Sequence, residues 1–104
     1  MARLTWTEPA LRDLETIAEY IVLDKPDAAQ AFVRKAFRAV ERLATFPKSG
    51  RVPPEIPDLP YRELIIHPCR VIYRIDQQMV FIIHVMRGEQ ELHRETFGER
   101  DESS

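Results

Sequence analysis

Arginines recur in the most strand-like part of the chain, between residues 60 and 88. Arg70 and Arg74 have the same parity as Ile72 in the apolar run CRVIYRI, so we expect both guanidinium groups on one face of a strand. Arg87 ends the next apolar run. Guanidinium groups bind carboxylates and phosphates through paired hydrogen bonds, so Arg70, Arg74 and Arg87 are the candidate target-binding residues.

The same arginines also have an ordinary structural explanation. Exposed arginines often form ion pairs with nearby acids, and such pairs contribute little to stability. Glu63 and Asp76 are the nearest candidates in the sequence. The sequence leaves both interpretations open.

RNA cleavage would need more than arginines. Activation of a 2′-hydroxyl and protonation of the leaving 5′-oxygen require an acid/base side chain beside clustered cations. The last tyrosine is Tyr73, and the C-terminal stretch ELHRETFG has Phe97 as its only aromatic residue. His93 is the remaining acid/base candidate. If the chain is a nuclease, we expect Arg70, Arg87 and His93 to be its catalytic residues.

Other chemistry has less support in the sequence. His67 and Cys69 have strand spacing, but structural zinc normally uses four clustered ligands. The three glycines do not form a phosphate-binding loop. We therefore expect no metal and no other cofactor. His84, inside VFIIHVM, is typical of a half-buried histidine that is hydrogen-bonded to a neighbour.

A net charge of −2 conceals a segregation of charge along the chain. Residues 28–88 contain ten Lys or Arg and five Asp or Glu, whereas the remainder contains five and twelve. Arg34, Arg38 and Arg42 have the i, i+4, i+8 spacing of one helix face. Such a row sometimes binds phosphates, but it is more often the solvated side of a helix. Exposed aromatic residues for base stacking are not interleaved with it, so we do not expect direct nucleic-acid binding.

The N-terminal half has the pattern of one strand and two helices. Residues 2–6 alternate as a half-buried strand, and Thr7 is a candidate N-cap for an amphipathic helix of about four turns. Pro26 suits the first turn of a second amphipathic helix, which runs to about Thr45. A short link between two such helices predicts an antiparallel helical hairpin.

The C-terminal half has the pattern of a small sheet. A loop at 46–60 holds five of the eight prolines and should cross the molecule without regular structure. We predict three strands, at 62–66, 70–74 and 80–87. The reversal between the last two is placed near Gln77 and Gln78, without a turn type because no Asn-Gly or Asp-Gly is present.

A chain of 104 residues is long enough for one domain, which we place at 1–92, followed by an acidic, flexible tail at 93–104. No apolar run approaches the ~20 residues that span a bilayer, and the N-terminus lacks the apolar core of a secretion signal. A single cysteine forms no internal disulfide. We therefore expect a cytoplasmic protein without a membrane segment.

Residues 3 to about 92 resemble the ParE/RelE toxin superfamily. The resemblance rests on the order β-α-α-β-β-β and on particular stretches: ALRDLETIAEYI, AAQAFVRKAFRAVERLATFP, Gly50-Arg51, RELIIHPCRVIYRI and a final VMRG. The fold that it implies is α+β, with an N-terminal strand and an antiparallel helical hairpin packed on a small antiparallel β-sheet.

Members of this superfamily are toxins of type II toxin–antitoxin systems. The long helical hairpin, and the lack of a tyrosine beyond the last strand, resemble the ParE-like branch. That resemblance implies a DNA gyrase inhibitor that acts by binding and forms a hetero-oligomer with a ParD-like antitoxin. The alternative is a RelE-like, ribosome-dependent mRNA endoribonuclease. Cys69 stands where the family usually has a tyrosine before the arginine, so a scaffold whose toxicity has decayed is a third alternative.

Both faces of the predicted sheet are largely apolar. In the last strand, two sets of residues alternate: Val80, Ile82, His84 and Met86 with Phe81, Ile83, Val85 and Arg87. One helical hairpin covers only one face of a sheet. We therefore expect an amphipathic antitoxin segment to bury the other face.

Overall fold

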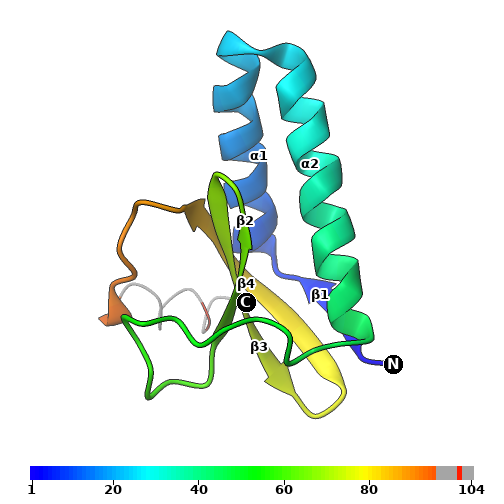
Figure 1. The fold of residues 1–104 in the computed structure, drawn as a ribbon, viewed down its shortest axis with the longest axis vertical. Helices are drawn as coiled ribbons and strands as arrows, with labels where there is room; N and C mark the ends of the chain where they lie inside the picture. The colour runs from blue at the N-terminus through cyan, green and yellow to red at the C-terminus, as the bar shows by residue number, and fades with distance from the viewer. Residues whose placement is uncertain (96–100, 102–104) are drawn as a thin grey trace.

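The computed structural model describes residues 1–95 and Asp101 (Figure 1). Its main elements are, in order, β1 (Arg3–Trp6), α1 (Glu8–Asp24), α2 (Pro26–Glu41), the 3-10 turn η1 (Arg42–Ala44), β2 (Arg62–Ile66), β3 (Cys69–Asp76) and β4 (Met79–Arg87). This order confirms the predicted α+β fold. Figure 1 shows α1 and α2 side by side as a long antiparallel pair against the sheet.

The four strands form one sheet in the order β1-β4-β3-β2. As predicted, β2, β3 and β4 form an antiparallel meander. β1 pairs with β4 in parallel, so the sheet is mixed and not wholly antiparallel. Two parallel neighbouring strands need a long connection between them. Here the helical hairpin, followed by β2 and β3, connects β1 to β4.

Thr7 attaches the start of α1 to the sheet. Its hydroxyl accepts a hydrogen bond from the backbone N–H of Ala10 at 3.4 Å, which makes Thr7 the predicted N-cap. The same hydroxyl donates to the carbonyl oxygen of Ile82 on β4 at 2.6 Å. One buried side chain therefore both begins the helix and fixes its position over β4.

The two faces of the sheet are covered by different parts of the chain. The helices pack on one face, where Leu14, Phe32 and Val40 meet strand residues such as Val71 and Ile82. On the other face, strand residues are buried by the loop at residues 46–60, which we call the crossing loop, and by the segment after β4. That second core contains Ile56, Tyr61, Ile72, Ile83, Met86 and Leu92. The prediction that an antitoxin segment would be needed to bury this face is wrong, because the chain covers it itself.

A bulge breaks the predicted alternation of β4. The register of β3 and β4 shifts between Ile72 and Tyr73, so that Ile82 and Val85 both lie in the helix-side core. Beyond the bulge the parity of β4 is reversed. Arg87 is therefore opposite Cys69 on the helix side, whereas Arg70 and Arg74 lie on the other face. The three candidate arginines do not share one face.

The reversal between β3 and β4 is the two-residue loop Gln77-Gln78, as predicted. Gln77 has a φ of 56°, in the left-handed region. A tight hairpin requires a positive φ at its first loop residue or at both, and glycine or asparagine usually meets this requirement. Glutamine occupies the position here, which explains why the sequence carried no turn signature.

The crossing loop is anchored at Gly50. The Tyr73 hydroxyl accepts a hydrogen bond from the Gly50 N–H at 2.9 Å and donates to the Pro47 carbonyl oxygen at 2.7 Å. A Cβ atom at Gly50 would lie 2.5 Å from that hydroxyl oxygen, so the close approach requires glycine. The next residue, Arg51, pairs with Glu63 on the outer edge of β2 as an isolated bridge.

Most of the predicted tail, residues 96–100 and 102–104, lies outside the described residues. Where the tail is described, it contacts the domain: Arg94 forms an ion pair with Asp58, and Asp101 with Arg74. None of the helices in the described part of the chain is long and apolar enough to cross a lipid bilayer.

Candidate functional site

Arg70 lies in a buried network of ion pairs on the face of the sheet opposite the helices. Its side chain is 6% exposed, and the side chain of Glu63 is fully buried. Nη1 and Nη2 of Arg70 donate to the two carboxylate oxygens of Glu55 at 2.7 and 2.8 Å, and Nε donates to Glu63 at 2.8 Å. Arg51 donates to the other Glu63 oxygen at 2.5 Å. Two guanidinium groups therefore balance two carboxylates.

This network uses every hydrogen-bond donor of Arg70. A guanidinium group has five N–H donors, and two more bonds complete the set: Nη2 also donates to Glu63, and Nη1 to the carbonyl oxygen of Gln90 at 3.0 Å. The backbone N–H of Leu92 donates to Glu55 at 3.2 Å. Arg70 therefore joins β2, the crossing loop and the segment after β4, and all five of its donors are used within the described part of the chain.

The network also fixes the charge states of its members. Hydrogen bonds from Arg70 lower the pKa of Glu55 to about 2, against the opposing effect of burial. The hydrogen bond with Glu55, followed by those with Glu63, raises the pKa of Arg70. Both groups stay ionised at neutral pH, and the network as a whole is close to neutral.

Arg74 lies on the same face of the sheet and is 26% exposed. Its Nε donates to both carboxylate oxygens of Asp101 at 3.0 Å, and Asp76 lies 3.7 Å away. Its guanidinium carbon is 4.6 Å from the centre of the Phe81 ring. Tyr61 also donates a hydrogen bond to Asp101. Burial of the Tyr61 hydroxyl, followed by this hydrogen bond, raises the pKa of Tyr61 to about 12. Arg74 is therefore partly accessible and held by its neighbours.

Arg87 is the most exposed of the three candidates, at 57% for its side chain. Its Nε lies 2.8 Å from a carboxylate oxygen of Glu89, in an ion pair that is open to solvent. Its guanidinium carbon lies 5.8 Å from the centre of the exposed Tyr20 ring on α1. Such exposed pairs exchange partners at little cost, so Arg87 is available to a binding partner.

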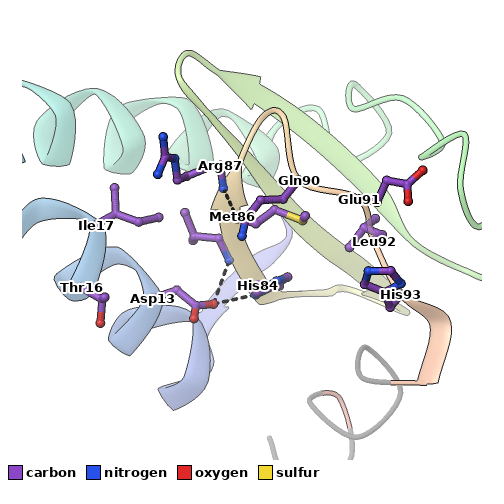
Figure 2. Close-up of a pocket in the computed structure, with 11 residues that line it drawn as sticks. Asp13, Thr16, Ile17, His84, Met86, Arg87, Gln90, Glu91, Leu92 and His93 are labelled. Carbon is purple, nitrogen blue, oxygen red and sulfur yellow. Dashed lines mark hydrogen bonds and ion pairs between the residues drawn. The ribbon is translucent and has the colours of Figure 1, made fainter. Parts of the chain in front are cut away.

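A groove lies between α1 and the end of β4, and Figure 2 shows the side chains that line it. We call it the α1/β4 groove; its volume is about 450 Å³. Its lining includes Asp13 and Ile17 from α1, His84 and Arg87 from β4, and Gln90 and Leu92 from the following segment. Because Arg70 and Glu55 hold the backbone of Gln90 and Leu92, the buried network fixes one wall of the groove.

Asp13 and His84 form a pair inside this groove. His84 Nδ1 lies 2.7 Å from Asp13 Oδ2, and the same oxygen accepts the backbone N–H of Val85 at 3.0 Å (Figure 2). The prediction of a half-buried, hydrogen-bonded His84 is confirmed. An Asp–His pair also occurs in acid–base catalysis, but the additional bond to Val85 gives Asp13 a structural role, which is to hold α1 against β4.

The structure separates the residues that would be catalytic in a nuclease. Arg87 and His93 both line the α1/β4 groove. Arg70 lies on the other face with its donors already used. Phe97, which stands where the nuclease interpretation would require an acid/base group, lies outside the described residues.

His67 and Cys69 line one pocket, with no further residue of the ligand types beside them that completes a metal site in the described part of the chain. Among the described residues, no group of three or more His, Cys, Asp or Glu side chains is placed to hold a metal ion. His67 is exposed, and Cys69 is buried. Burial raises the pKa of the Cys69 thiol to about 11, so it is protonated at neutral pH and a poor nucleophile.

Sequence reasoning identified part of this arrangement. It named Glu63 and Asp76 as possible arginine partners, and both pairs form. It missed Glu55, because the residue lies in an irregular proline-rich loop with no period to place it. It also missed Asp13, which has the ordinary appearance of a polar residue on an amphipathic helix.

The first prediction concerns Arg70→Lys. Lysine keeps the charge but has three donors in place of five, so the carboxylates of Glu55 and Glu63 lose part of their hydrogen bonds. We expect the free energy of unfolding to fall by about 2–4 kcal/mol in urea denaturation. Arg87→Lys, the same exchange at a mostly exposed side chain, should change it by less than about 0.5 kcal/mol. Equal losses in the two variants would contradict the role assigned to Arg70.

The second prediction concerns pH. The folded pKa of Glu55, about 2, is below its ordinary value of 4.5, so its pairing with Arg70 stabilises the fold fully above about pH 4.5. This contribution is lost as the pH falls towards 2. We expect the melting temperature of Glu55→Gln to depend less on pH than that of the wild type over this window, by circular dichroism. Glu15→Gln, at an exposed position of α1, should keep the wild-type slope, and an equal flattening there would refute the assignment.

Comparison with known proteins agrees with this fold. Residues 4–92 match the family model described as the ParE toxin of type II toxin-antitoxin system, parDE. A protein named "Putative toxin Y4kP" from Sinorhizobium fredii is 42% identical over 91 residues, which cover 86% of this chain and 91% of that protein. "Toxin RelE2" from Caulobacter vibrioides is 35% identical over 86 residues, covering 82% and 93%.

Solved structures include a similar chain. In a structure of the chromosomal ParDE TA system from P. aeruginosa, one chain aligns with a TM-score of 0.73 at 28% identity, covering 86% of this chain and 98% of that chain. The family match spans most of the sequence, and the relatives are covered almost completely. The chain belongs to the ParE toxin family of type II toxin–antitoxin systems, within the RelE/ParE superfamily.

Proposed function

We propose that the chain is a toxin that binds and inhibits DNA gyrase, and that a cognate ParD-like antitoxin neutralises it. Membership of the ParE toxin family supports this target. One observation carries the choice of binding over RNA cleavage: all five donors of Arg70 are used by groups of the chain itself.

Phosphodiester cleavage develops negative charge on the phosphate, and catalysts stabilise it with cations that are free to donate. Arg70 is the arginine that the nuclease interpretation places at this point, yet its charge is balanced by Glu55 and Glu63. Freeing it would leave a fully buried carboxylate without its main partner, which costs several kcal/mol. The role that fits Arg70 is therefore to hold the segment that forms one wall of the α1/β4 groove.

Arg87, with Arg74 as a second candidate, is the arginine that we assign to target contact. Arg87 combines high exposure with a weak partner, Glu89. It also projects beside Tyr20, an exposed aromatic residue of α1. Aromatic and arginine side chains dominate the binding energy of many protein interfaces. Arg70 takes part indirectly, through the position of Gln90 and Leu92.

The antitoxin site that we propose is the α1/β4 groove with Tyr20 at its edge. The groove is lined largely by apolar groups, among them Ile17, Val85 and Leu92. Tyr20 and Leu23, on the same helix, are 68% and 85% exposed. An amphipathic antitoxin segment that buries these groups would also cover Arg87, which gives neutralisation a direct physical cause.

Gyrase inhibition is tested by titrating the protein into a plasmid supercoiling assay with purified gyrase, beside an mRNA cleavage assay on programmed ribosomes. We expect inhibited supercoiling and intact message. Arg87→Ala should raise the half-inhibitory concentration about tenfold, the cost of a moderate interface residue. Arg12→Ala is the matched control, because Arg12 is also exposed and paired with a glutamate, Glu8.

Two outcomes would overturn the proposal of gyrase inhibition, and a third would overturn the assignment of Arg87. Cleavage of the mRNA together with normal supercoiling by gyrase would identify a RelE-like nuclease. No effect in either assay would indicate a scaffold whose toxicity has decayed. Equal inhibition by Arg87→Ala and the wild type would remove Arg87 from the contact surface.

The antitoxin site is tested with Tyr20→Ala and the cognate antitoxin in a calorimetric binding experiment. Loss of an exposed aromatic residue at the edge of the groove should weaken binding about tenfold or more without unfolding the toxin. Phe46→Ala is the control, because Phe46 is 63% exposed but lies in the crossing loop. If both variants lowered the affinity for the antitoxin equally, or if neither variant lowered it, the antitoxin would bind elsewhere.

A further inference from the structure

Four cationic side chains are grouped on the exposed face of α2 and η1. Arg34, Lys35, Arg38 and Arg42 are all exposed, and with Ala31 they line a shallow hollow of about 470 Å³. At 1.5 Å of rise per residue, Arg34 and Arg42 are separated by about 12 Å along the helix. We call these four residues the α2 basic face.

The four cations of the α2 basic face differ from most of the other described arginines in having no acidic partner. Six of the eight other described arginines are paired with carboxylates of the chain: Arg12, Arg51, Arg70, Arg74, Arg87 and Arg94. The other two do not form a group: Arg3 lies on β1, and Arg62 on β2 donates to the backbone carbonyl oxygen of Gly50. Among residues 1–95 and 101, no carboxylate lies within ion-pair distance of the four cations of α2 and η1. Although acidic residues are in excess in the chain, four cations of one helix face thus form no ion pair, and Glu41 is the nearest acid along the helix.

Helix electrostatics explain only half of this group. Cations in the last turn of a helix interact favourably with its dipole, which accounts for Arg38 and Arg42. Arg34 and Lys35 lie further from the C-terminal end and gain little from the dipole, because its effect falls off within the last turn. Like charges at i, i+4 destabilise a helix slightly, so the group has a cost that its own helix does not offset.

We propose that the α2 basic face binds the phosphate backbone of duplex DNA. Protein partners normally bury an apolar centre, with lysine depleted from the contact. The hollow offers only Ala31 as an apolar residue. Protein–DNA contacts are instead polar and strongly positive, and arginine binds phosphate through paired hydrogen bonds.

Duplex DNA fits this face better than single-stranded nucleic acid. Single strands are bound by stacking their bases on exposed aromatic rings. Phe37, the more exposed of the two aromatic residues of α2 at 37%, packs against Trp6 with 4.9 Å between ring centres and does not line the hollow of the four cations. Contact limited to phosphates predicts binding without sequence preference. The sequence alone did not favour this conclusion, because such a row is more often the solvated side of a helix and has no interleaved aromatic residues. It also does not show that the cations lack partners.

The test measures fluorescence anisotropy of a labelled duplex of about 20 base pairs with the full chain, without gyrase, between about 20 and 200 mM salt. Three phosphate contacts predict a roughly 500-fold loss of affinity across this tenfold range of salt. The variant Arg34→Gln/Arg38→Gln/Arg42→Gln should bind at least about tenfold more weakly at the lowest salt, with a much smaller salt dependence.

The control variant is Arg3→Gln/Arg12→Gln/Arg94→Gln, which removes the same charge at other exposed positions. We expect it to bind DNA as the wild type does, while circular dichroism shows both variants folded. Equal affinity of the two triple variants would overturn the proposal, because net charge alone would then explain binding. Binding of a poly-glutamate peptide without binding of duplex DNA would also overturn it and indicate an acidic protein as the partner.

Discussion

The ion-pair network around Arg70 is the interaction on which the other features of this toxin depend. It joins three segments that have no continuous secondary structure in common: the crossing loop through Glu55, β2 through Glu63, and the segment after β4 through Gln90. Buried ion pairs add little net stability, because desolvation offsets their attraction, but breaking one is costly. The network therefore acts mainly by specifying geometry. It fixes where the chain leaves the sheet, and with it one wall of the α1/β4 groove.

The bulge in β4 has a second organising effect, because it divides the arginines between two sides of the sheet. Arg70 and Arg74 stay on the face that the chain covers with its own loop and C-terminal segment. Arg87 is turned to the helix side, next to Tyr20. One side thus has a structural role, and the other offers exposed arginine and aromatic groups beside an apolar groove. This division fits a protein that acts by binding better than one that assembles a cationic catalytic centre.

Charge pairing separates structural cations from those available to partners. Where carboxylates surround an arginine, as at Arg70, its electrostatic potential is cancelled within the fold. Where cations form no ion pair, as on the α2 basic face, more of the potential extends into solvent. The acidic sequence pI of about 5.9 is therefore a poor guide to the surface that a partner meets. Target contact and antitoxin binding are assigned to overlapping residues around Arg87, whereas contact with DNA is assigned to the α2 basic face, so contact with DNA is separable from the other two by mutation.

The sequence by itself determined the order of the elements, the helical hairpin, the meander, the Thr7 cap and the reversal at Gln77, because each depends on local period or local hydrogen bonds. It also named the arginines and two of their partners. Tertiary structure alone decided the parallel pairing of β1, the bulge, the covering of the second face, and the roles of Glu55 and Asp13. These features depend on contacts between residues far apart in the chain, such as Asp13 with His84 and Arg70 with Gln90, and a local pattern carries no record of such contacts.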